Sequence, residues 1–182
     1  MNFGTTRTRL ATAVAAAVAT AALAVSASPA SATSAQGYFT GYGAWTDDWS
    51  NEGTLSTGSY ANSNATCLWQ EILWAEGATE SNGTAYDEAD IDGIFGPNTE
   101  YASKKLQTRW GLDNDGRVGP LTLGTADNKL RYISGSTEAG TLYLRYDGAA
   151  HDFTLRRDDS NRYWFVKDGA WRVAAYNYRT CS

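Results

Sequence analysis

One eight-residue pattern, Asp-Gly-x-apolar-Gly-Pro-x-Thr, occurs twice in this chain, at residues 92–99 and 115–122. Its first half favours a tight turn, because glycine adopts positive φ without a Cβ clash and the Asp side chain bonds the local backbone. Its second half favours a helix start, since proline at the first helical position lacks only an N–H that would have no partner. The apolar residue between the halves, Phe95 or Val118, is expected to be buried. The repeat therefore predicts two turns, each followed by a helix.

The region around the repeat resembles a small three-helix family of peptidoglycan-binding-like domains, found beside many bacterial cell-wall enzymes. The family has a Leu-Gln-x-x-Leu helix before the first turn, and residues 69–73 read Trp-Gln-Glu-Ile-Leu. Its later parts, DG-x-FG-x-x-T…A…(F/L)Q and GL-x-x-DG-x-VGP-x-T, match residues 92–107 and 111–122. Trp69 stands where the family usually has Leu. The resemblance covers residues 62–130 and implies peptidoglycan, either its glycan or its stem peptide, as the ligand.

In such domains the ligand is expected in the groove beside the first turn and the helix that follows it. Backbone N–H groups at a helix N-terminus lack partners and can receive a carboxylate. Asn98 is expected to be exposed there, and Gly93 and Gly96 are expected where a Cβ would be crowded. The turn alone also explains most of these residue types. The resemblance implies this set of ligand contacts: Asp92, Ile94, Phe95, Gly96, Asn98 and Thr99.

The capping residues set the ends of the predicted helices. Ser63 or Asn64 can cap the first helix, because a side-chain oxygen there can accept a hydrogen bond from a free amide of the first turn. Gly77 and Gly111 are typical of the position just after a helix. Helices are therefore predicted at residues 64–76, 97–110 and 120–128.

After Arg131 the apolar period changes from 3.6 residues to 2, which is typical of strands. Leu142, Leu144 and Tyr146 alternate with other residues, and Asp-Gly pairs follow at intervals. This pattern predicts an antiparallel meander of about four strands, which resembles no family known to us. So thin a sheet needs the helices or a disulfide to cover one face. The predicted fold class is α+β: a three-helix peptidoglycan-binding-like module, then a small antiparallel meander, joined by one disulfide.

The N-terminus has the features of a secretory signal peptide. Arg7 and Arg9 precede an apolar run, and Ala30-Ser31-Ala32 is a small-residue cleavage site. A membrane anchor is the alternative, but the run is only moderately apolar. The chain is expected to be bacterial, secreted and cell-wall associated, with no membrane contact after cleavage. The predicted segments are a signal peptide (1–32), a lead-in (33–63), the helical domain (64–130) and a β domain (131–182).

The lead-in mixes Gly, Ser, Thr and Asn with aromatic residues. The polar residues indicate a linker, whereas the rings indicate packing. We expect the rings to cover the helical module, and stacking on a sugar is the alternative. Trp69, Trp74 and Trp110 in the helices are likewise expected in the core rather than on a sugar-binding surface.

Two cysteines, Cys67 and Cys181, are expected to form a disulfide, because the chain is exported. This bond would join the first helix to the C-terminal tail. Free or intermolecular thiols are the alternative. A catalytic cysteine is disfavoured, since no suitable base accompanies it.

The charge is uneven along the chain. Residues 33–130 carry 14 acidic side chains against 5 basic ones, and residues 131–182 carry 6 against 8. An acidic module is not attracted to nucleic acid or to anionic wall polymers by charge. Binding to the wall must therefore depend on shape and hydrogen bonds.

Few residues support catalysis. His151 is the only histidine, so neither a zinc hydrolase site nor a Ser-His or Cys-His pair can be assembled. The acids at residues 87–92 are candidates for a glycosidase pair or a calcium loop. A loop exposed to water would leave their pKa values ordinary, and Pro97 and Thr99 occupy positions where a calcium loop has other residues. No catalytic residue, metal or cofactor is therefore predicted.

Large rings occupy both faces of the predicted sheet, since Trp164 and Val166 alternate with Tyr163 and Phe165. Only one face can cover the helices, so the other is free for a partner or is covered by the lead-in. The sequence thus predicts a secreted, non-catalytic peptidoglycan-binding protein. The alternative is a secreted protein-interaction factor or enzyme inhibitor that binds a protein partner through the sheet.

Overall fold

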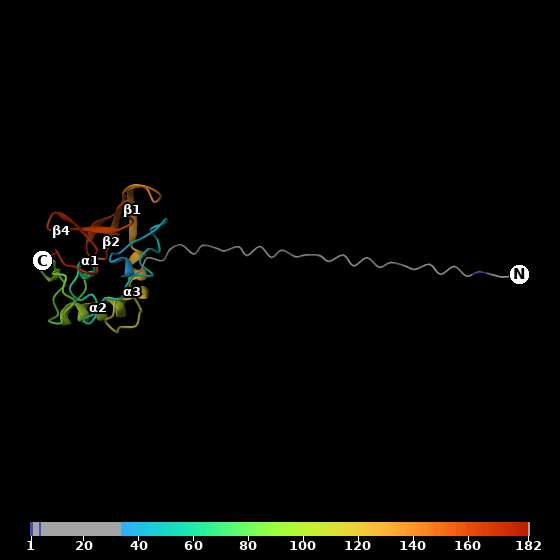
Figure 1. The fold of residues 1–182 in the computed structure, drawn as a ribbon. Coiled ribbons are helices and arrows are strands. Elements are labelled where there is room, and N and C mark those ends of the chain that lie inside the picture. The colour runs from blue at the N-terminus through green and yellow to red at the C-terminus, as the bar shows by residue number, and fades with distance from the viewer. Residues whose placement is uncertain (2–3, 5–33, 182) are drawn as a thin grey trace.

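The computed structural model describes Met1, Gly4 and residues 34–181. The predicted signal peptide, apart from Met1 and Gly4, lies outside the described residues. The sheet lies at one end of the fold and helices α2 and α3 at the other, with α1 between them (Figure 1). The elements are η1 (Ser34–Gln36), α1 (Asn64–Ala75), η2 (Glu88–Asp90), α2 (Pro97–Arg109), α3 (Pro120–Asp127), β1 (Leu130–Gly135), β2 (Leu142–Asp147), β3 (Asp152–Arg157), β4 (Tyr163–Lys167) and β5 (Ala170–Val173).

The helices begin and end where their capping residues predict. The Ser63 hydroxyl accepts a hydrogen bond from the Thr66 amide at 3.0 Å, which caps α1. Helices α2 and α3 each begin with the proline of the repeat. Gly77 and Gly111 follow α1 and α2 with φ values of 58° and 71°, a conformation that strains residues with a side chain. All three predicted helices are confirmed, each to within one residue at its end.

The sheet contains five antiparallel strands in the order β1-β2-β3-β4-β5, so the prediction of about four is one too few. Strand β1 is the additional one. Its register shifts between Tyr132 and Ser134, and the neighbouring side chains of Tyr132 and Ile133 are 51% and 49% exposed. The bulge breaks the alternation of buried and exposed residues, and the sequence pattern consequently does not indicate a strand.

Helix α1 forms the centre of the core. It packs against α2 on one side and against β2 and β3 on the other. Leu144, Leu155 and Phe165 on the inner face of the sheet are fully buried, as are Leu68 and Ile72 of α1. One cluster of buried residues extends from the helices to the sheet. The division into two domains at residue 130 stays a prediction.

The lead-in contacts the sheet as well as the helices. The Phe39 amide donates to the Ala174 carbonyl at 2.8 Å, and its carbonyl accepts from the Tyr163 amide at 2.9 Å. The Trp49 ring stands edge-on to Tyr163 at 5.3 Å. The sequence-based expectation names the helical module, and the contacts of these rings with the sheet are additional to it. The backbone groups beyond β5 give the extended lead-in a partner that the sequence pattern does not reveal.

The predicted disulfide is confirmed. Cys67 of α1 is bonded to Cys181, with Cα atoms 6.5 Å apart. Asn64 joins the same two segments, since its side chain accepts from the Thr180 amide at 2.8 Å and donates to the Val173 carbonyl at 3.0 Å. The C-terminal tail is thus fixed along the first turn of α1.

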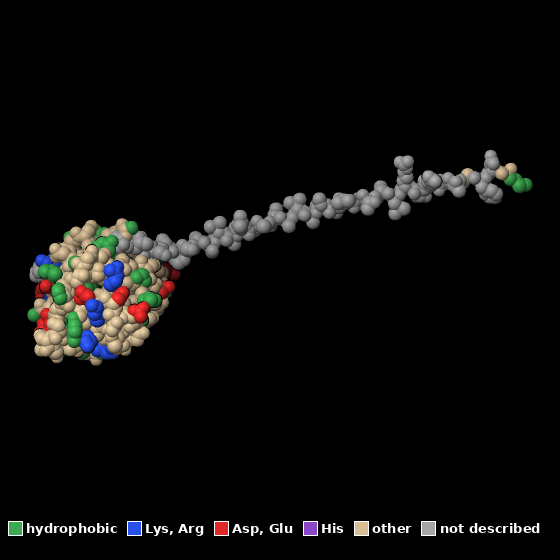
Figure 2. Space-filling view, turned by 90° about the horizontal axis from the view of Figure 1, so that it is seen from below, with side chains coloured by type: hydrophobic (Ala, Val, Ile, Leu, Met, Phe, Trp, Pro, Cys, Tyr) green, Lys and Arg blue, Asp and Glu red, His purple; other side chains and the backbone are tan. Residues whose placement is uncertain are grey.

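The surface around α2 and α3 is mixed in character. Figure 2, seen from below, shows acidic and basic side chains interspersed among small separate groups of hydrophobic side chains. In the described part of the chain, no helix has both the length and the apolar character that crossing a bilayer requires.

Candidate functional site

Each copy of the repeat is built around a buried glutamine from the helix that precedes it. In the first copy this residue is Gln70 of α1. Its side-chain amide donates to Asp92 Oδ1 at 3.0 Å, to the Ile94 carbonyl at 3.2 Å and to Thr99 Oγ1 at 3.1 Å. Its carbonyl oxygen accepts from the Gly93 amide at 2.6 Å. The glutamine thus satisfies the polar groups inside the turn.

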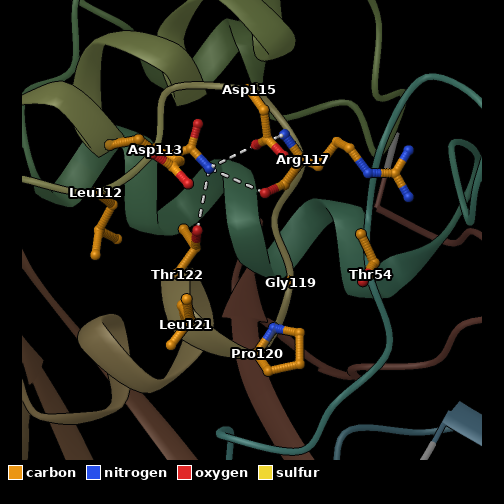
Figure 3. A pocket seen from close by; sticks show the side chains of 10 residues that line it. Thr54, Leu112, Asp113, Asp115, Arg117, Gly119, Pro120, Leu121 and Thr122 are labelled. Atoms are coloured by element: carbon orange, nitrogen blue, oxygen red, sulfur yellow. Dashed lines mark hydrogen bonds between the residues drawn. The ribbon is translucent and has the colours of Figure 1, made fainter.

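Gln107 of α2 does the same in the second copy. Its amide donates to Asp115 Oδ1 at 3.3 Å, to the Arg117 carbonyl at 2.9 Å and to Thr122 Oγ1 at 3.1 Å (Figure 3). Its carbonyl oxygen accepts from the Gly116 amide at 2.9 Å. Each turn therefore contains the same set of internal hydrogen bonds around its own glutamine.

The two turns also match in backbone geometry. Gly93 and Gly116 both have φ of 75°, which favours glycine. Asp92 Oδ1 accepts from the Ile94 amide at 2.8 Å, and Asp115 Oδ1 accepts from the Arg117 amide at the same distance. The Asp, Gly and Thr of each copy are thus required by the fold itself.

The lead-in holds both turns in place. The Phe95 amide donates to the Ala61 carbonyl at 2.7 Å, and the Val118 amide donates to the Leu55 carbonyl at 2.9 Å. Phe95 and Val118 are buried, as predicted. Residues 55–62 consequently connect the two copies along one side.

The first copy is covered by two other parts of the chain. The Asn98 side chain donates from Nδ2 to Glu80 Oε1 at 2.6 Å, so the loop at residues 77–91 lies against the start of α2. From the tail, Arg179 Nη1 donates to the Asp92 carbonyl at 3.0 Å. A Cβ on Gly93 would lie 2.8 Å from both Cys181 Sγ and Arg179 Cδ. The surface of the first turn is therefore largely occupied by the protein itself.

Electrostatics support this arrangement around Asn98. Hydrogen bonds from Thr84 and Asn98 hold the pKa of Glu80 below its ordinary value, so its carboxylate stays ionised as an acceptor. Burial raises the pKa of neighbouring Asp90. Burial also raises the pKa of Tyr86, whose hydroxyl lies 3.2 Å from Thr99 Oγ1. The hydroxyl of Tyr86 accordingly stays neutral and packs against Thr99 at the start of α2.

The second copy is open. The connection before it, residues 111–114, is much shorter than residues 77–91 and does not cover the turn. A groove of about 340 Å³ lies there (Figure 3), and Leu121 at its edge is 81% exposed. The groove is lined by Thr54, Gln107, Leu112, Asp113, Asp115, Arg117, Gly119, Pro120, Leu121 and Thr122.

The structure brings the six predicted contact residues together at the first turn, but few are accessible. Phe95 and Thr99 are each only 2% exposed, whereas Ile94 is 46% exposed. Asn98 was expected to be exposed but is partly buried, because its side chain donates to Glu80. A Cβ on Gly96 would meet no atom within 4 Å, so the expectation of crowding there is also wrong. Ligand contact at this turn stays a prediction.

The residues of the open groove are absent from the sequence-based set. Arg117 and Leu121 occupy the places in the second copy that Ile94 and Asn98 occupy in the first. The repeat gives no reason to prefer one copy. The available signal was the length of the preceding connection, since a short connection cannot fold over the turn that follows it.

A group of acids is buried between the lead-in and the sheet. Asp48 accepts from Arg157 Nη1 at 2.6 Å, and both side chains are 2% exposed. Glu52 accepts from the Thr40 amide and the Tyr176 hydroxyl, both at 2.7 Å, and burial raises its pKa to about 7. Asp127 is 1% exposed, and burial raises its pKa to about 8. The contacts of Asp48 and Glu52 fix the lead-in to the sheet.

The outer face of the sheet carries a second candidate surface. The Arg156 guanidinium lies 4.8 Å from the Trp164 ring and 4.7 Å from the Trp171 ring. Arg162 also lies over Trp164, at 5.5 Å, and Asp158 accepts from both Arg162 and Trp164. The lead-in reaches this face only at its edge, where the Tyr38 ring lies 5.6 Å from Arg162. The outer face is thus an ordered array of rings and guanidinium groups.

The structure also shows where the three helix tryptophans and His151 lie. Trp69 is fully buried, while Trp74 and Trp110 are partly buried against the core. His151 is exposed, and its ring stacks on Trp74 at 4.4 Å. Within the described residues, no group of three or more His, Cys, Asp or Glu side chains is arranged to hold a metal ion.

Comparison with known proteins supports the resemblance of the helical region. Residues 70–125 match the family model described as "Putative peptidoglycan binding domain", a span that contains both copies of the repeat and both glutamines. The predicted family is thereby confirmed for this segment. A curated relative from Kitasatospora aureofaciens, described as "Uncharacterized protein in bpoA1 3'region", is 52% identical over 46 residues. The aligned part spans 25% of this chain and 39% of that relative. No solved structure gave a significant match.

Proposed function

We propose that this is an exported, non-catalytic protein that binds peptidoglycan through the groove at the second turn. The observation that carries the proposal is the open groove inside the segment that matches a peptidoglycan-binding family. The equivalent surface of the first turn is occupied by residues 77–91 and by the tail. The two turns are alike inside, and they differ in whether a ligand can reach them.

The groove suits a ligand with both apolar and charged parts. Leu112, Pro120 and Leu121 offer apolar surface, and Arg117 offers a guanidinium that can pair with a carboxylate. Peptidoglycan presents methyl groups and carboxylates close together on its stem peptides. Binding of this acidic module to peptidoglycan would depend on shape and a few polar contacts, as the sequence analysis expects.

Export is part of the proposal and rests on residues 1–32. Cleavage after Ala32 would leave a mature chain that begins at or near Thr33. N-terminal sequencing of the secreted protein tests this directly. A secreted chain that still begins at Met1 would contradict the proposed export route.

The outer face of the sheet favours a second candidate function, the binding of a protein partner. Trp164, Trp171 and Arg156 are residue types that recur at the centres of protein interfaces. Their packing against one another fixes their side chains before any partner arrives, and less conformational entropy is lost on binding. A secreted interaction factor or enzyme inhibitor would use this face.

Co-sedimentation with purified peptidoglycan sacculi tests these functions with matched variants. Arg117→Ala and Leu121→Ala change the open groove, whereas Ile94→Ala and Asn98→Ala change the equivalent positions of the first turn. Trp164→Ala changes the sheet. We expect each groove variant to weaken binding roughly fivefold or more, because apolar area or a charged hydrogen bond is lost from the complex. The first-turn variants and Trp164→Ala should bind like the parent.

Each other outcome has a defined meaning. Loss of binding in Ile94→Ala or Asn98→Ala alone would show that the ligand binds at the first turn. Loss in Trp164→Ala alone would move it to the sheet. Failure of the parent protein to sediment, together with recovery of a protein partner, would replace wall binding by the second candidate function.

A further inference from the structure

A second cleft lies between α1 and the sheet, and it shares no lining residue with the groove at the second turn. It has a volume of about 330 Å³ and is lined by residues from α1, η2, β3 and β4. Trp74, Phe153 and Val166 form apolar walls, and Glu71 and Glu88 contribute carboxylates. No step of the proposed wall binding uses this cleft.

Glu71 is the unusual residue of the cleft. It is only 5% exposed, and within residues 34–181 no hydrogen bond satisfies its carboxylate. Burial raises its pKa to about 7. Its oxygens face the cleft and have no donor among these residues, so a donor that enters the cleft can form a hydrogen bond with them.

Lys167 is the nearby cation, and its amine is already engaged. Its ammonium favours the ionised form of Glu71. However, Lys167 Nζ donates to the Glu88 carbonyl at 3.1 Å and lies 3.6 Å from Asp168 Oδ1. Three acidic residues, Glu71, Glu88 and Asp168, therefore surround one basic residue, Lys167, and the cleft has an excess of negative charge.

We propose that this cleft binds a primary ammonium group at the end of an aliphatic chain, with the Glu71 carboxylate accepting its hydrogen bond. The aliphatic chain would lie against Phe153 and Val166, and the Trp74 ring would favour a cation nearby. A carboxylate or phosphate would be repelled by the acids. A neutral hydroxyl would satisfy the hydrogen bond but not the charge. Such ammonium groups occur on diamino-acid residues of peptides and on free polyamines.

The inference does not depend on wall binding, because the probe is a small amine and the variants lie outside the groove. The test is an NMR titration of the full secreted chain with Nα-acetyl-lysine methylamide, following the Trp74 indole N–H signal, assigned with Trp74→Phe. The control ligand is Nα-acetyl-norleucine methylamide, which has a similar aliphatic chain but no amine. We expect the lysine compound to shift the Trp74 signal saturably, and the norleucine compound to leave it unchanged at the same concentrations.

Three variants then define the role of each charge. Glu71→Gln keeps the shape of the side chain and should weaken binding about tenfold or more. Lys167→Met removes a competing cation and should tighten binding severalfold, whereas an anionic ligand would lose affinity. Glu138→Gln changes an exposed acid far from the cleft in sequence and should have no effect.

The two sources of the ammonium group are separated by a titration with 1,5-diaminopentane. Equal or tighter binding of this diamine would identify free polyamines as the ligand, and weaker binding would identify a peptide residue. Both results support an ammonium site. Equal binding of the norleucine compound, or unchanged affinity in Glu71→Gln, would overturn the proposal.

Discussion

The side chains of Gln70 and Gln107 occupy equivalent positions in two successive turns. Each accepts a hydrogen bond from the glycine of an Asp-Gly pair, at 2.6 Å and 2.9 Å. Each donates to the Asp of that pair and to a Thr seven residues later. The two helix-to-helix connections are therefore one structural unit used twice, and the pair can be tested as such.

Replacement of either glutamine by alanine should destabilise the fold by a similar amount. Gln70→Ala and Gln107→Ala each leave a buried glycine amide without its partner and remove one hydrogen bond to a buried threonine hydroxyl. A cost of about 2–3 kcal/mol in the free energy of unfolding is expected for each. Urea denaturation measures it. The exposed Gln36→Ala is the control and should cost less than about 1 kcal/mol. A cost no larger than this control would refute the structural role of the two glutamines.

Replacement of the glycines should have unequal effects, although their backbones match. Gly93→Ala and Gly116→Ala both introduce strain at φ of 75°, of about 1–2 kcal/mol. At Gly93 the new Cβ would also lie 2.8 Å from Cys181 Sγ, which the disulfide holds. At Gly116 it would meet the flexible side chains of Glu100 and Lys104, which can move. Gly93→Ala should thus cost at least about 1 kcal/mol more by urea denaturation, and equal costs would contradict this.

Reduction of the Cys67–Cys181 disulfide should lower stability substantially. The bond closes a loop with a sequence separation of 114. The chain-entropy account gives up to about 4–5 kcal/mol for a loop of this length. We expect a loss of about 4 kcal/mol when urea denaturation is repeated with a reductant. The double variant Cys67→Ala/Cys181→Ala should not respond to the reductant. A parent protein equally insensitive to it would show that the cross-link adds no stability.

Stability should fall as the pH rises, in part because of Asp127. Its pKa is raised by burial from an ordinary value of 3.8 to about 8 in the folded state, so between these values the folded state retains a proton that the unfolded state releases. Proton release on unfolding makes unfolding more favourable as pH rises. The slope from one such group is at most about 1.4 kcal/mol per pH unit.

The variant Asp127→Asn isolates this contribution. Glu52 and Glu71, whose pKa values are raised to about 7, act in the same direction in both proteins and cancel in the comparison. Unfolding free energies measured from pH 5 to pH 8 should therefore decline less steeply in the variant. Parallel pH profiles would mean that Asp127 does not hold a proton in this range.

Much of the helical region could be predicted, because its turns are encoded by local chemistry. Gly93 and Gly116 supply positive φ, and Pro97 and Pro120 suit the first position of a helix. Strand β1 could not be predicted, since its bulge removes the alternation on which strand prediction depends. The place of Phe39 depends on Ala174, far along the chain, and local patterns carry no such information.

The candidate site was harder to predict than the fold. The two copies of the repeat follow the same sequence pattern, and they differ in how much of each turn is exposed. That accessibility depends on Glu80 bonding to Asn98 and on Arg179 reaching Asp92. These contacts join distant segments, and only the folded chain brings them together.

The long connection at residues 77–91 has a consequence for valency. Both turns have the same internal bonds, and the segment 55–62 holds them at a fixed spacing. A chain with a connection as short as residues 111–114, and without the tail contact from Arg179 to Asp92, would expose a second groove at the first turn. Two grooves on one rigid body would bind a repeating polymer with an avidity above that of either groove alone. Loss of both covers, the loop and the tail contact, would therefore give a chain with two grooves in place of one.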